Sequence, residues 1–304
     1  MSKHRWFRVC LLLPALVIVL VCACAQPARP VNHSENPALR PEDSALRRTN
    51  TGQTQGTVVP NTSALGMEVR YGAVIRGPRD RKRLALVFTG HEFAEGAESI
   101  LNQLARHRAK ASFFLTGDFL RNPSFVGLVG RMVKDGHKLG PHSDKHLLYC
   151  SWEKDRKTLV SREQFETDLS ANLNELQKQA PEQSFRYFLP PYEHYNQQIT
   201  DWARTLQLVL VNFTAGTRST ADYTGEADAN FVSTADIFES IVRKERQDPD
   251  GLRGFILLLH LGAGPGRADK FHARFGELLD FLAAKGYQPV TLQELLESQG
   301  LRGR

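Results

Sequence analysis

The sequence contains few cysteines. There are four in 304 residues, and three of them, Cys10, Cys22 and Cys24, lie in the first 25 residues. Only Cys150 lies in the body of the chain, so we expect no internal disulfide there. A lone cysteine of this kind is more often a small buried apolar residue than a nucleophile. Fold stability must therefore come from a packed core, and the composition of 41% hydrophobic and 24% charged residues is typical of a globular protein.

The chain also lacks an apolar run long enough to cross a bilayer. Residues 9–21 are apolar, but a transmembrane helix needs roughly 20 such residues. A basic segment precedes this run and VCACAQ follows it, which is typical of an export signal. We expect residues 1–25 to be a signal peptide of lipoprotein type, with Cys24 lipidated and the protein anchored at the cell envelope. Cleavage at Ala23-Cys24-Ala25, giving a periplasmic or secreted protein, is the alternative.

The chain from residue 84 onward lacks an excess of positive charge. Of the formal charge of +6, residues 1–25 carry +3 and residues 26–83 carry +5, which leaves −2 on residues 84–304. A domain that reads DNA or RNA carries its basic residues on the fold itself. The charge distribution therefore argues against a nucleic-acid partner, and it leaves the lipid on Cys24 as the only expected membrane contact.

Residues 26–66 lack both apolar residues and periodicity. They are rich in Pro, Ser, Asn, Thr, Arg and Gln, a composition that favours a disordered tether. No second linker and no internal repeat follows. We therefore expect residues 67–304 to form a single catalytic domain.

Apolar and amphipathic segments alternate along this domain. We expect strands over 84–89, 111–116, 186–189, 208–213, 254–261 and 287–291. We expect helices over 95–108, 123–134, 163–179, 196–206, 234–246, 271–285 and 292–298. Near-continuous apolar strands separated by helices predict an α/β fold with a parallel sheet, either a barrel or a doubly wound sheet. In both, active-site residues gather at the carboxyl ends of the strands.

Two motifs place a histidine close to a second ionisable residue. In VFTGHEF, His91 and Glu92 follow a buried strand. In GHKLGPHSDKHLLY, His142 and His146 are four residues apart. On a helical turn these two imidazoles would share a face and could bind one metal ion. Two unrelated surface histidines are the alternative.

Two further strand ends carry shape-setting or ionisable residues. FRYFLPPYEHYN runs from a strand into Pro190, Pro191 and Tyr192, which form either a rigid turn or a wall that offers Tyr192 to a substrate. GFILLLHLG ends an apolar strand in His260. A buried imidazole needs a polar partner, so His260 is either a catalytic residue or a satisfied core histidine.

The order of these four strand ends resembles the polysaccharide deacetylase family, also called the NodB-homology domain or carbohydrate esterase family 4. The resemblance extends from about Gly72 to Leu296. Its motifs are GAVIRG (72–77), ASFFLTG (111–117), His142-Ser143-x-x-His146, the proline pair with Tyr192, Leu259-His260 and KGYQPVTLQEL (285–295). The resemblance implies a distorted (β/α)7 barrel and one divalent metal ion, usually Zn²⁺. It also implies that His142 and His146 bind the metal, that Pro191 and Tyr192 bind substrate, and that His260 is the catalytic acid.

The first motif departs from the family pattern. Members of the family carry Phe-Asp-Asp-Gly, with one Asp as base and the next as metal ligand, whereas this chain reads Phe88-Thr89-Gly90-His91-Glu92. We prefer Glu92 as metal ligand with His91 as catalytic base, and the swapped assignment is the alternative.

Three other positions bear on the same site. Leu189 replaces the arginine that normally orients the base, and Glu193 replaces a glycine. Loss of both the Asp and the Arg fits either a rebuilt base or an inactive site. Arg218 and Asp222, in the stretch 212–223, are the candidates for the residue that orients His260.

The expected function is that of a metal-dependent hydrolase. It would remove acetyl groups from an N-acetylated or O-acetylated envelope or dietary polysaccharide or oligosaccharide, with metal-bound water as nucleophile. A catalytically inactive carbohydrate-binding protein on the same barrel is the alternative. A third possibility keeps the metal chemistry on another substrate, such as an O-acetyl ester or a non-sugar amide.

Overall fold

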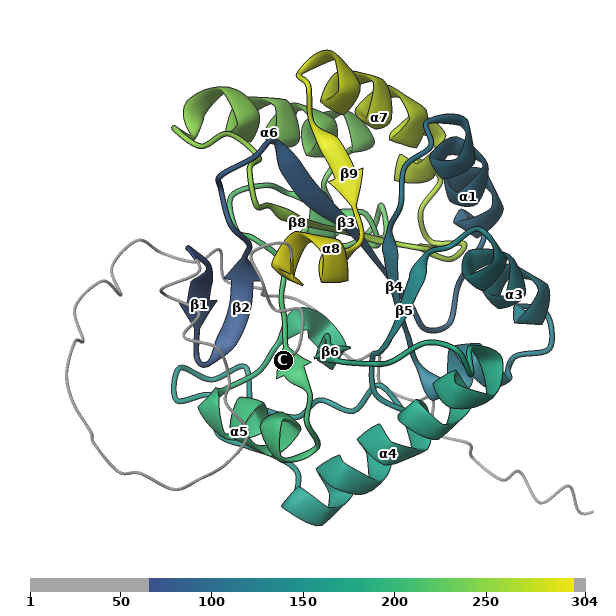
Figure 1. The fold of residues 1–304 in the computed structure, drawn as a ribbon, viewed down its shortest axis with the longest axis vertical. Coiled ribbons are helices and arrows are strands. Elements are labelled where there is room, and N and C mark those ends of the chain that lie inside the picture. Colours follow the sequence, from purple (N-terminus) through teal and green to yellow (C-terminus); the bar gives the residue numbers. More distant parts are fainter. Residues whose placement is uncertain (1–65, 298–304) are drawn as a thin grey trace, which may run out of the picture. The chain divides into compact units, whose positions relative to one another are not determined.

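The computed structural model describes residues 66–297 (Figure 1). The expected signal peptide, the lipidated Cys24 and nearly all of the expected tether lie outside these residues. Across residues 66–297, no helix is long and apolar enough to span a membrane.

A parallel sheet of five strands forms the centre of the fold. Its strands are β3 (Arg83–Gly90), β4 (Ser112–Leu115), β5 (Lys138–Pro141), β8 (Ile256–His260) and β9 (Gln288–Val290). Their order is β5-β4-β3-β8, and β9 pairs with the beginning of β3. The register places Thr89 opposite His260, so the carboxyl ends of β3 and β8 lie side by side.

Two smaller sheets complete a ring of strands. They are the antiparallel pair β1 (Glu68–Arg70) and β2 (Ala73–Arg76) and the parallel pair β6 (Tyr187–Phe188) and β7 (Val209–Leu210). Backbone hydrogen bonds just outside the named strands join the three sheets. The amide of Leu189, just past β6, donates to the carbonyl oxygen of Pro141 in β5 over 3.2 Å. Beyond β7, the amide of Asn212 donates to Val74 of β2 over 2.9 Å, and that of Thr214 donates to Ile256 of β8 over 3.0 Å. The strands therefore lie in the order β8-β3-β4-β5-β6-β7, with β2 beside the end of β7, as in a distorted barrel, which confirms the expected α/β architecture.

Helices surround these strands (Figure 1). Their bounds are α1 (Ala97–Arg106), α2 (Gly117–Arg121), α3 (Val126–Lys134), α4 (Arg162–Gln179), α5 (Gln197–Thr205), α6 (Thr234–Gln247), α7 (Phe275–Ala284) and α8 (Leu292–Glu297). All seven expected helices are present within a few residues of their predicted ends. The sequence reasoning missed α2, β1, β2 and β5, because each is short and has little apolar periodicity.

Alternation along β3 separates two cores. Leu84, Leu86 and Phe88 pack into an outer core between the sheet and the helices α1 and α7. Ala85 and Val87 pack into an inner core enclosed by the ring of strands. Because successive side chains of a strand point to opposite faces, the side chain of Thr89 points to the inner side of the sheet, as those of Ala85 and Val87 do. The inner residues at the strand ends therefore form the mouth of the barrel.

Candidate active site

Four side chains from distant parts of the chain meet at the carboxyl ends of the strands. The ring of His91 stacks on that of His146, with centroids 4.5 Å apart and planes 13° apart. His146 also contacts His142, at 5.1 Å, and Tyr192, at 4.4 Å. The loops after β3, β5 and β6 thus deliver three imidazoles and one phenol to a single site.

His142 is held as a neutral imidazole at the end of β5. Its side chain is buried, with 1% of the residue surface exposed, and its Nδ1 lies 2.8 Å from the carbonyl oxygen of Leu189. Because a carbonyl only accepts, Nδ1 donates and Nε2 is left as an acceptor. Burial lowers the pKa of His142 to about 3, although the Leu189 carbonyl opposes this shift. An imidazole oriented in this way can bind a metal ion or a water molecule.

His146 does not lie on a helix, so that expectation was wrong. Residues 142–149 form a bend and an irregular loop, in which Ser143 (φ 71°) and His146 (φ 53°) adopt left-handed backbone conformations. The backbone N–H of His146 donates to Ser143 Oγ over 2.8 Å, which closes a local turn. The two imidazoles meet through this turn rather than through helical i, i+4 spacing.

His91 and Glu92 separate as they leave β3. His91 is half-buried, and its Nδ1 lies 3.2 Å from Thr116 Oγ1. Burial lowers the pKa of His91 below its ordinary value, although Asp118 and Glu92 oppose the shift. Glu92 is exposed to solvent. Both residues lie just past the end of β3, in a bend, and only His91 is brought against His146.

The donors do not form the metal site that the resemblance implies. Within residues 66–297, no group of three or more His, Cys, Asp and Glu side chains is arranged to hold a metal ion. Glu92 is not brought together with His142 and His146 in such a group. The near-parallel stacking of His91 on His146 turns ring faces, not nitrogen lone pairs, toward each other. The side chains present therefore do not fit a three-ligand divalent ion.

His260 and Asp222 form a hydrogen-bonded pair at the end of β8. His260 Nδ1 donates to Asp222 Oδ1 over 2.6 Å, and the backbone N–H of His260 donates to Asp222 Oδ2 over 2.8 Å. Burial alone would lower the pKa of His260, but the carboxylates of Asp222 and Glu193 outweigh it and raise the pKa above its ordinary value. This arrangement favours a protonated imidazole, as a general acid requires.

Of the two candidates for orienting His260, the structure places only Asp222 against it. Arg218 lies one turn earlier, and its backbone N–H donates to Ser240 Oγ of α6 over 2.8 Å. Among the described residues, no hydrogen bond or ion pair joins the Arg218 side chain to His260.

Tyr192 and Glu193 lie on a strained turn beside this pair. Both adopt left-handed backbone conformations, with φ of 58° and 52°, directly after Pro190 and Pro191. The side-chain amide of Asn212 donates to the Glu193 carbonyl over 2.7 Å and holds the turn in place. Left-handed backbone costs a non-glycine residue roughly 1–2 kcal/mol, so other contacts must stabilise this turn.

Glu193 supplies a second carboxyl group to the site. Its side chain is half-buried, and burial raises its pKa to about 7, opposed by His260 and reinforced by Asp222. From the sequence we noted only that Glu193 replaces a glycine of the family pattern. The signal that could have revealed it was an acidic residue at a family glycine position.

Thr89 is another site residue that the sequence reasoning missed. Its hydroxyl is buried and has no hydrogen-bond partner within residues 66–297. It occupies the position after Phe88 where the family carries its catalytic Asp, and it lies opposite His260 in the sheet. A buried hydroxyl without a protein partner is a candidate for a hydrogen bond to an ordered water molecule.

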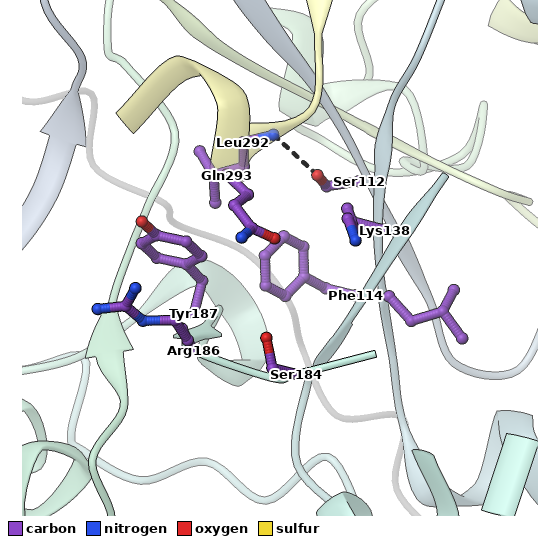
Figure 2. Close-up of a pocket in the computed structure, with 9 residues that line it drawn as sticks. Ser112, Phe114, Lys138, Ser184, Arg186, Tyr187, Leu292 and Gln293 are labelled. Atoms are coloured by element: carbon purple, nitrogen blue, oxygen red, sulfur yellow. Dashed lines mark hydrogen bonds between the residues drawn. The ribbon is translucent and has the colours of Figure 1, made fainter. Parts of the chain in front are cut away.

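The pocket drawn in Figure 2 lies at the other end of the barrel. It is lined by residues at the beginnings of β4 and β5, among them Ser112 and Lys138, and by Arg186, Tyr187 and Leu292. The backbone N–H of Leu292 donates to Ser112 Oγ over 2.9 Å, which ties α8 to β4. No histidine lines this pocket, so we do not assign it to the catalytic site.

Two sequence comparisons find similar proteins. A family profile described as "Polysaccharide deacetylase" matches residues 76–211. A peptidoglycan-N-acetylglucosamine deacetylase of Bacillus cereus is 24% identical over 231 residues, which cover 75% of this chain and 74% of the relative.

Solved structures share the fold. The Bc1960 peptidoglycan N-acetylglucosamine deacetylase superposes with a TM-score of 0.61 at 21% identity, covering 79% of this chain and 98% of that one. A CE4 family pseudoenzyme from Bacillus anthracis superposes with a TM-score of 0.58 at 18% identity, covering 75% and 69%. The matched profile and the curated relative show that this chain belongs to the polysaccharide deacetylase family.

Proposed function

We propose that the protein is a hydrolase that removes acetyl groups from N-acetylated sugars of a polysaccharide, with peptidoglycan as the first candidate substrate. The Asp222–His260 pair carries this proposal, because it provides an oriented acid at the strand end where the fold gathers its polar residues. The peptidoglycan deacetylases among the relatives support the choice of substrate.

The described residues supply an acid and a base for amide hydrolysis. His91, whose pKa is lowered, is neutral at pH 7 and accepts a proton from water as its oxygen attacks the acetyl carbonyl carbon. His260 Nε2 then donates its proton to the amide nitrogen as the C–N bond breaks. Acetate and a free amine leave. His91 then releases its proton to solvent and His260 takes up a proton from solvent, which restores both groups. Asp222 holds His260 in the required tautomer and orientation.

Three other residues shape the substrate side of the site. The turn through Pro191 fixes Tyr192 over the ring of His146, beside the reacting centre. The free Nε2 of His142 can accept a hydrogen bond from the attacking water. These assignments give Pro191 and Tyr192 a role in substrate binding and His142 a role in positioning water.

A catalytically inactive carbohydrate-binding protein is the second candidate. The absence of a three-donor metal group within residues 66–297 favours it, because deacetylases of this family are generally metal-dependent. The similarity in fold to a CE4 family pseudoenzyme is consistent with either candidate.

Acetate release separates the two candidates. The purified protein is incubated with N-acetylglucosamine oligomers, peptidoglycan fragments and O-acetylated xylan, each with and without added Zn²⁺. We expect acetate from the N-acetylated substrates, and its dependence on Zn²⁺ tests whether His142 and His146 rearrange around an ion. Binding of a glycan without acetate in either condition would support the inactive protein instead. Acetate from xylan alone would indicate an esterase.

A further inference from the structure

The irregular turn that carries His142 and His146 is bound to helix α4 through its backbone. We call residues 142–146 the histidine turn. Three of its backbone N–H groups donate to two side chains of α4, Asp168 and Asn172. These two residues are four positions apart on the buried face of the helix, so their side chains lie next to each other. The conformation of the turn therefore depends on polar side chains from a distant part of the chain.

Asp168 is a buried carboxylate with three hydrogen-bond donors. Its Oδ1 accepts from the backbone N–H of Lys145 over 2.9 Å, and its Oδ2 accepts from that of Asp144 over 3.2 Å. The hydroxyl of Tyr149 also donates to Oδ2, over 2.6 Å. An ionised carboxylate can accept all three bonds, whereas a neutral side chain of the same size cannot. The residue is 7% exposed, so a donor that lost its bond here would find little water to replace it.

Asn172 joins the histidine turn to the end of β4. Its Oδ1 accepts from the backbone N–H of His142 over 2.8 Å, and its Nδ2 donates to the carbonyl oxygen of Leu115 over 3.0 Å. The ring of His142 is fixed separately by the Leu189 carbonyl. Both the backbone and the imidazole of His142 are thereby held in place.

Helix α2 holds the same turn from the carbonyl side. The carbonyl oxygens of Ser143 and Asp144 accept from the N–H groups of Gly117 and Asp118, over 3.1 and 3.3 Å. The carboxylate of Asp144 also accepts two bonds from Arg121 of α2, over 2.6 and 3.0 Å. The turn contains two left-handed residues, each of which costs roughly 1–2 kcal/mol, and these bonds to α2 and α4 offset that cost.

We propose that Asp168 and Asn172 are positioning residues of the candidate site, which act through the backbone of the histidine turn. They hold the turn in the conformation that stacks His146 on His91 and that keeps His142 beside them. This positioning role concerns the shape of the site. Its effect on acetate release rests on the proposed function.

Histidine NMR tests the positioning without requiring turnover. A ring proton that lies over the face of another aromatic ring resonates upfield of its ordinary position, so the wild type should show upfield-shifted ring protons of His91, identified by their loss in His91→Gln. Asp168→Asn keeps the size of the side chain but turns an amide NH₂ group toward a donor. The upfield shift should then be lost. No upfield-shifted resonance in the wild type, or an unchanged one in folded Asp168→Asn, would overturn the proposal.

Two control variants separate positioning from a general loss of stability. Asp248→Asn alters another partly buried carboxylate, which pairs with Arg76 over 2.9 Å outside the site, and it should keep the upfield shift. Tyr149→Phe removes only the phenol donor of Asp168 and should keep the shift as well. Loss of the shift in either control would contradict a role that acts through the backbone N–H groups of the turn.

Amide hydrogen exchange of the wild type gives a test that needs no variant. The N–H groups of Asp144 and Lys145 lie in a loop, but Asp168 accepts both of them. They should therefore exchange about a hundredfold or more slowly than in an unfolded peptide. Exchange at the rate of an unfolded peptide would contradict the proposal.

Acetate release measures the consequence for activity. Asp168→Asn should lower kcat by about tenfold or more, because the groups that position water are displaced. The alkaline limb of the pH profile, which belongs to His260, should stay in place. An unchanged kcat, or a shifted alkaline limb, would contradict this role. An upfield shift that Asp168→Asn removes, in a wild type that releases no acetate, would retain the positioning role and reject the proposed hydrolase.

Discussion

His260 lies within reach of two carboxyl groups that differ in their environment. Asp222 is hydrogen-bonded to both the ring and the backbone of His260, whereas Glu193 is half-buried on a strained turn and its carboxyl group receives no hydrogen bond from a described residue. Groups whose pKa values are pushed apart by their surroundings are typical of acid–base sites. The two histidines of the site differ in the same way: the pKa of His260 is raised above its ordinary value, and that of His91 is lowered below it.

The pH dependence of activity should reflect both histidines. Activity requires neutral His91, whose pKa is below 6.5, and protonated His260, whose pKa is above 6.5, so kcat/KM for acetate release should be bell-shaped across neutral pH. Replacing Asp222 by Asn removes the charge that raises the pKa of His260. The alkaline limb should therefore move to lower pH by roughly 1–3 units. An alkaline limb that does not move in Asp222→Asn would show that another group is the acid.

Glu193 should reduce the stability of the fold at neutral pH. Glu193→Gly removes left-handed strain of roughly 1–2 kcal/mol, offset by about 0.4–1 kcal/mol of added entropy in the unfolded chain. It also removes a carboxyl group whose pKa in the folded state, about 7, exceeds the ordinary value of 4.5. Such a group contributes stability at low pH and loses it as pH rises through its folded pKa, so the advantage of the variant should grow between about pH 5 and pH 8.

Urea denaturation at several pH values measures this effect. Gln207→Gly is the matched control, because Gln207 is exposed, has φ of 61° and lies outside the site. Gln207→Gly should change the free energy of unfolding only through the loss of left-handed strain, by an amount that does not vary with pH. Equal free energies of unfolding for Glu193→Gly and the wild type at pH 8 would contradict the destabilising role of Glu193.

Single residues were predictable from sequence where a motif fixed their place. His142, His146, His260 and Asp222 were named in advance, and the structure brings each to the mouth of the barrel. The choice between His91 and Glu92 could not be made, because the direction of a side chain just past a strand end depends on a backbone bend. Whether these residues act as assigned remains a prediction.

At the scale of elements, one buried arginine organises the loop that carries Asp222. Arg267 is fully buried, and its guanidinium donates to the carbonyl oxygens of Asp269, Thr224 and Val232 over 2.6, 3.0 and 2.8 Å. These bonds join the segments before α6 and after β8. Arg267 thereby keeps the loop of Asp222 next to the end of β8.

Loss of this arginine should be costly. Arg267→Met leaves several buried carbonyl groups without donors, so the free energy of unfolding should fall by about 3 kcal/mol or more. Arg204→Met, which removes an exposed arginine paired with Asp201, should change it by less than about 1 kcal/mol. Thermal denaturation followed by circular dichroism measures both. A loss for Arg267→Met no larger than for Arg204→Met would contradict this role.

Long elements were predictable and short ones were not. The 18 residues of α4 carry a capping box, in which Ser161 and Gln164 cap each other's backbone, and their boundaries agreed with the sequence. Strand β5, with four residues that include Gly140 and Pro141, gave no clear period, and its hydrogen bonds come from β4 across the sheet. The expected helical turn at His142 failed for the same reason, since tertiary pairing overrides local preference.

At the scale of the whole molecule, the ring of strands explains why distant motifs converge. Parallel strands place their carboxyl ends on one side, so the loops after β3, β5, β6 and β8 share a single mouth. Sequence alone indicated the barrel through family resemblance, but it could not show that isolated hydrogen bonds, rather than a continuous ladder, join the end of β7 to β2 and to β8. Nor could it show that the metal donors fail to converge, because this depends on the stacking of His91 on His146.

The most direct test of the central claim is acetate release from an N-acetylglucosamine oligomer by the wild type and by His260→Ala, with the free amines formed counted in the same reaction. The account predicts acetate and amine in equal amounts from the wild type, and a loss of about a hundredfold or more in kcat for His260→Ala with the oligomer still bound. No acetate from the wild type with Zn²⁺ supplied, or equal rates for the two proteins, would contradict it.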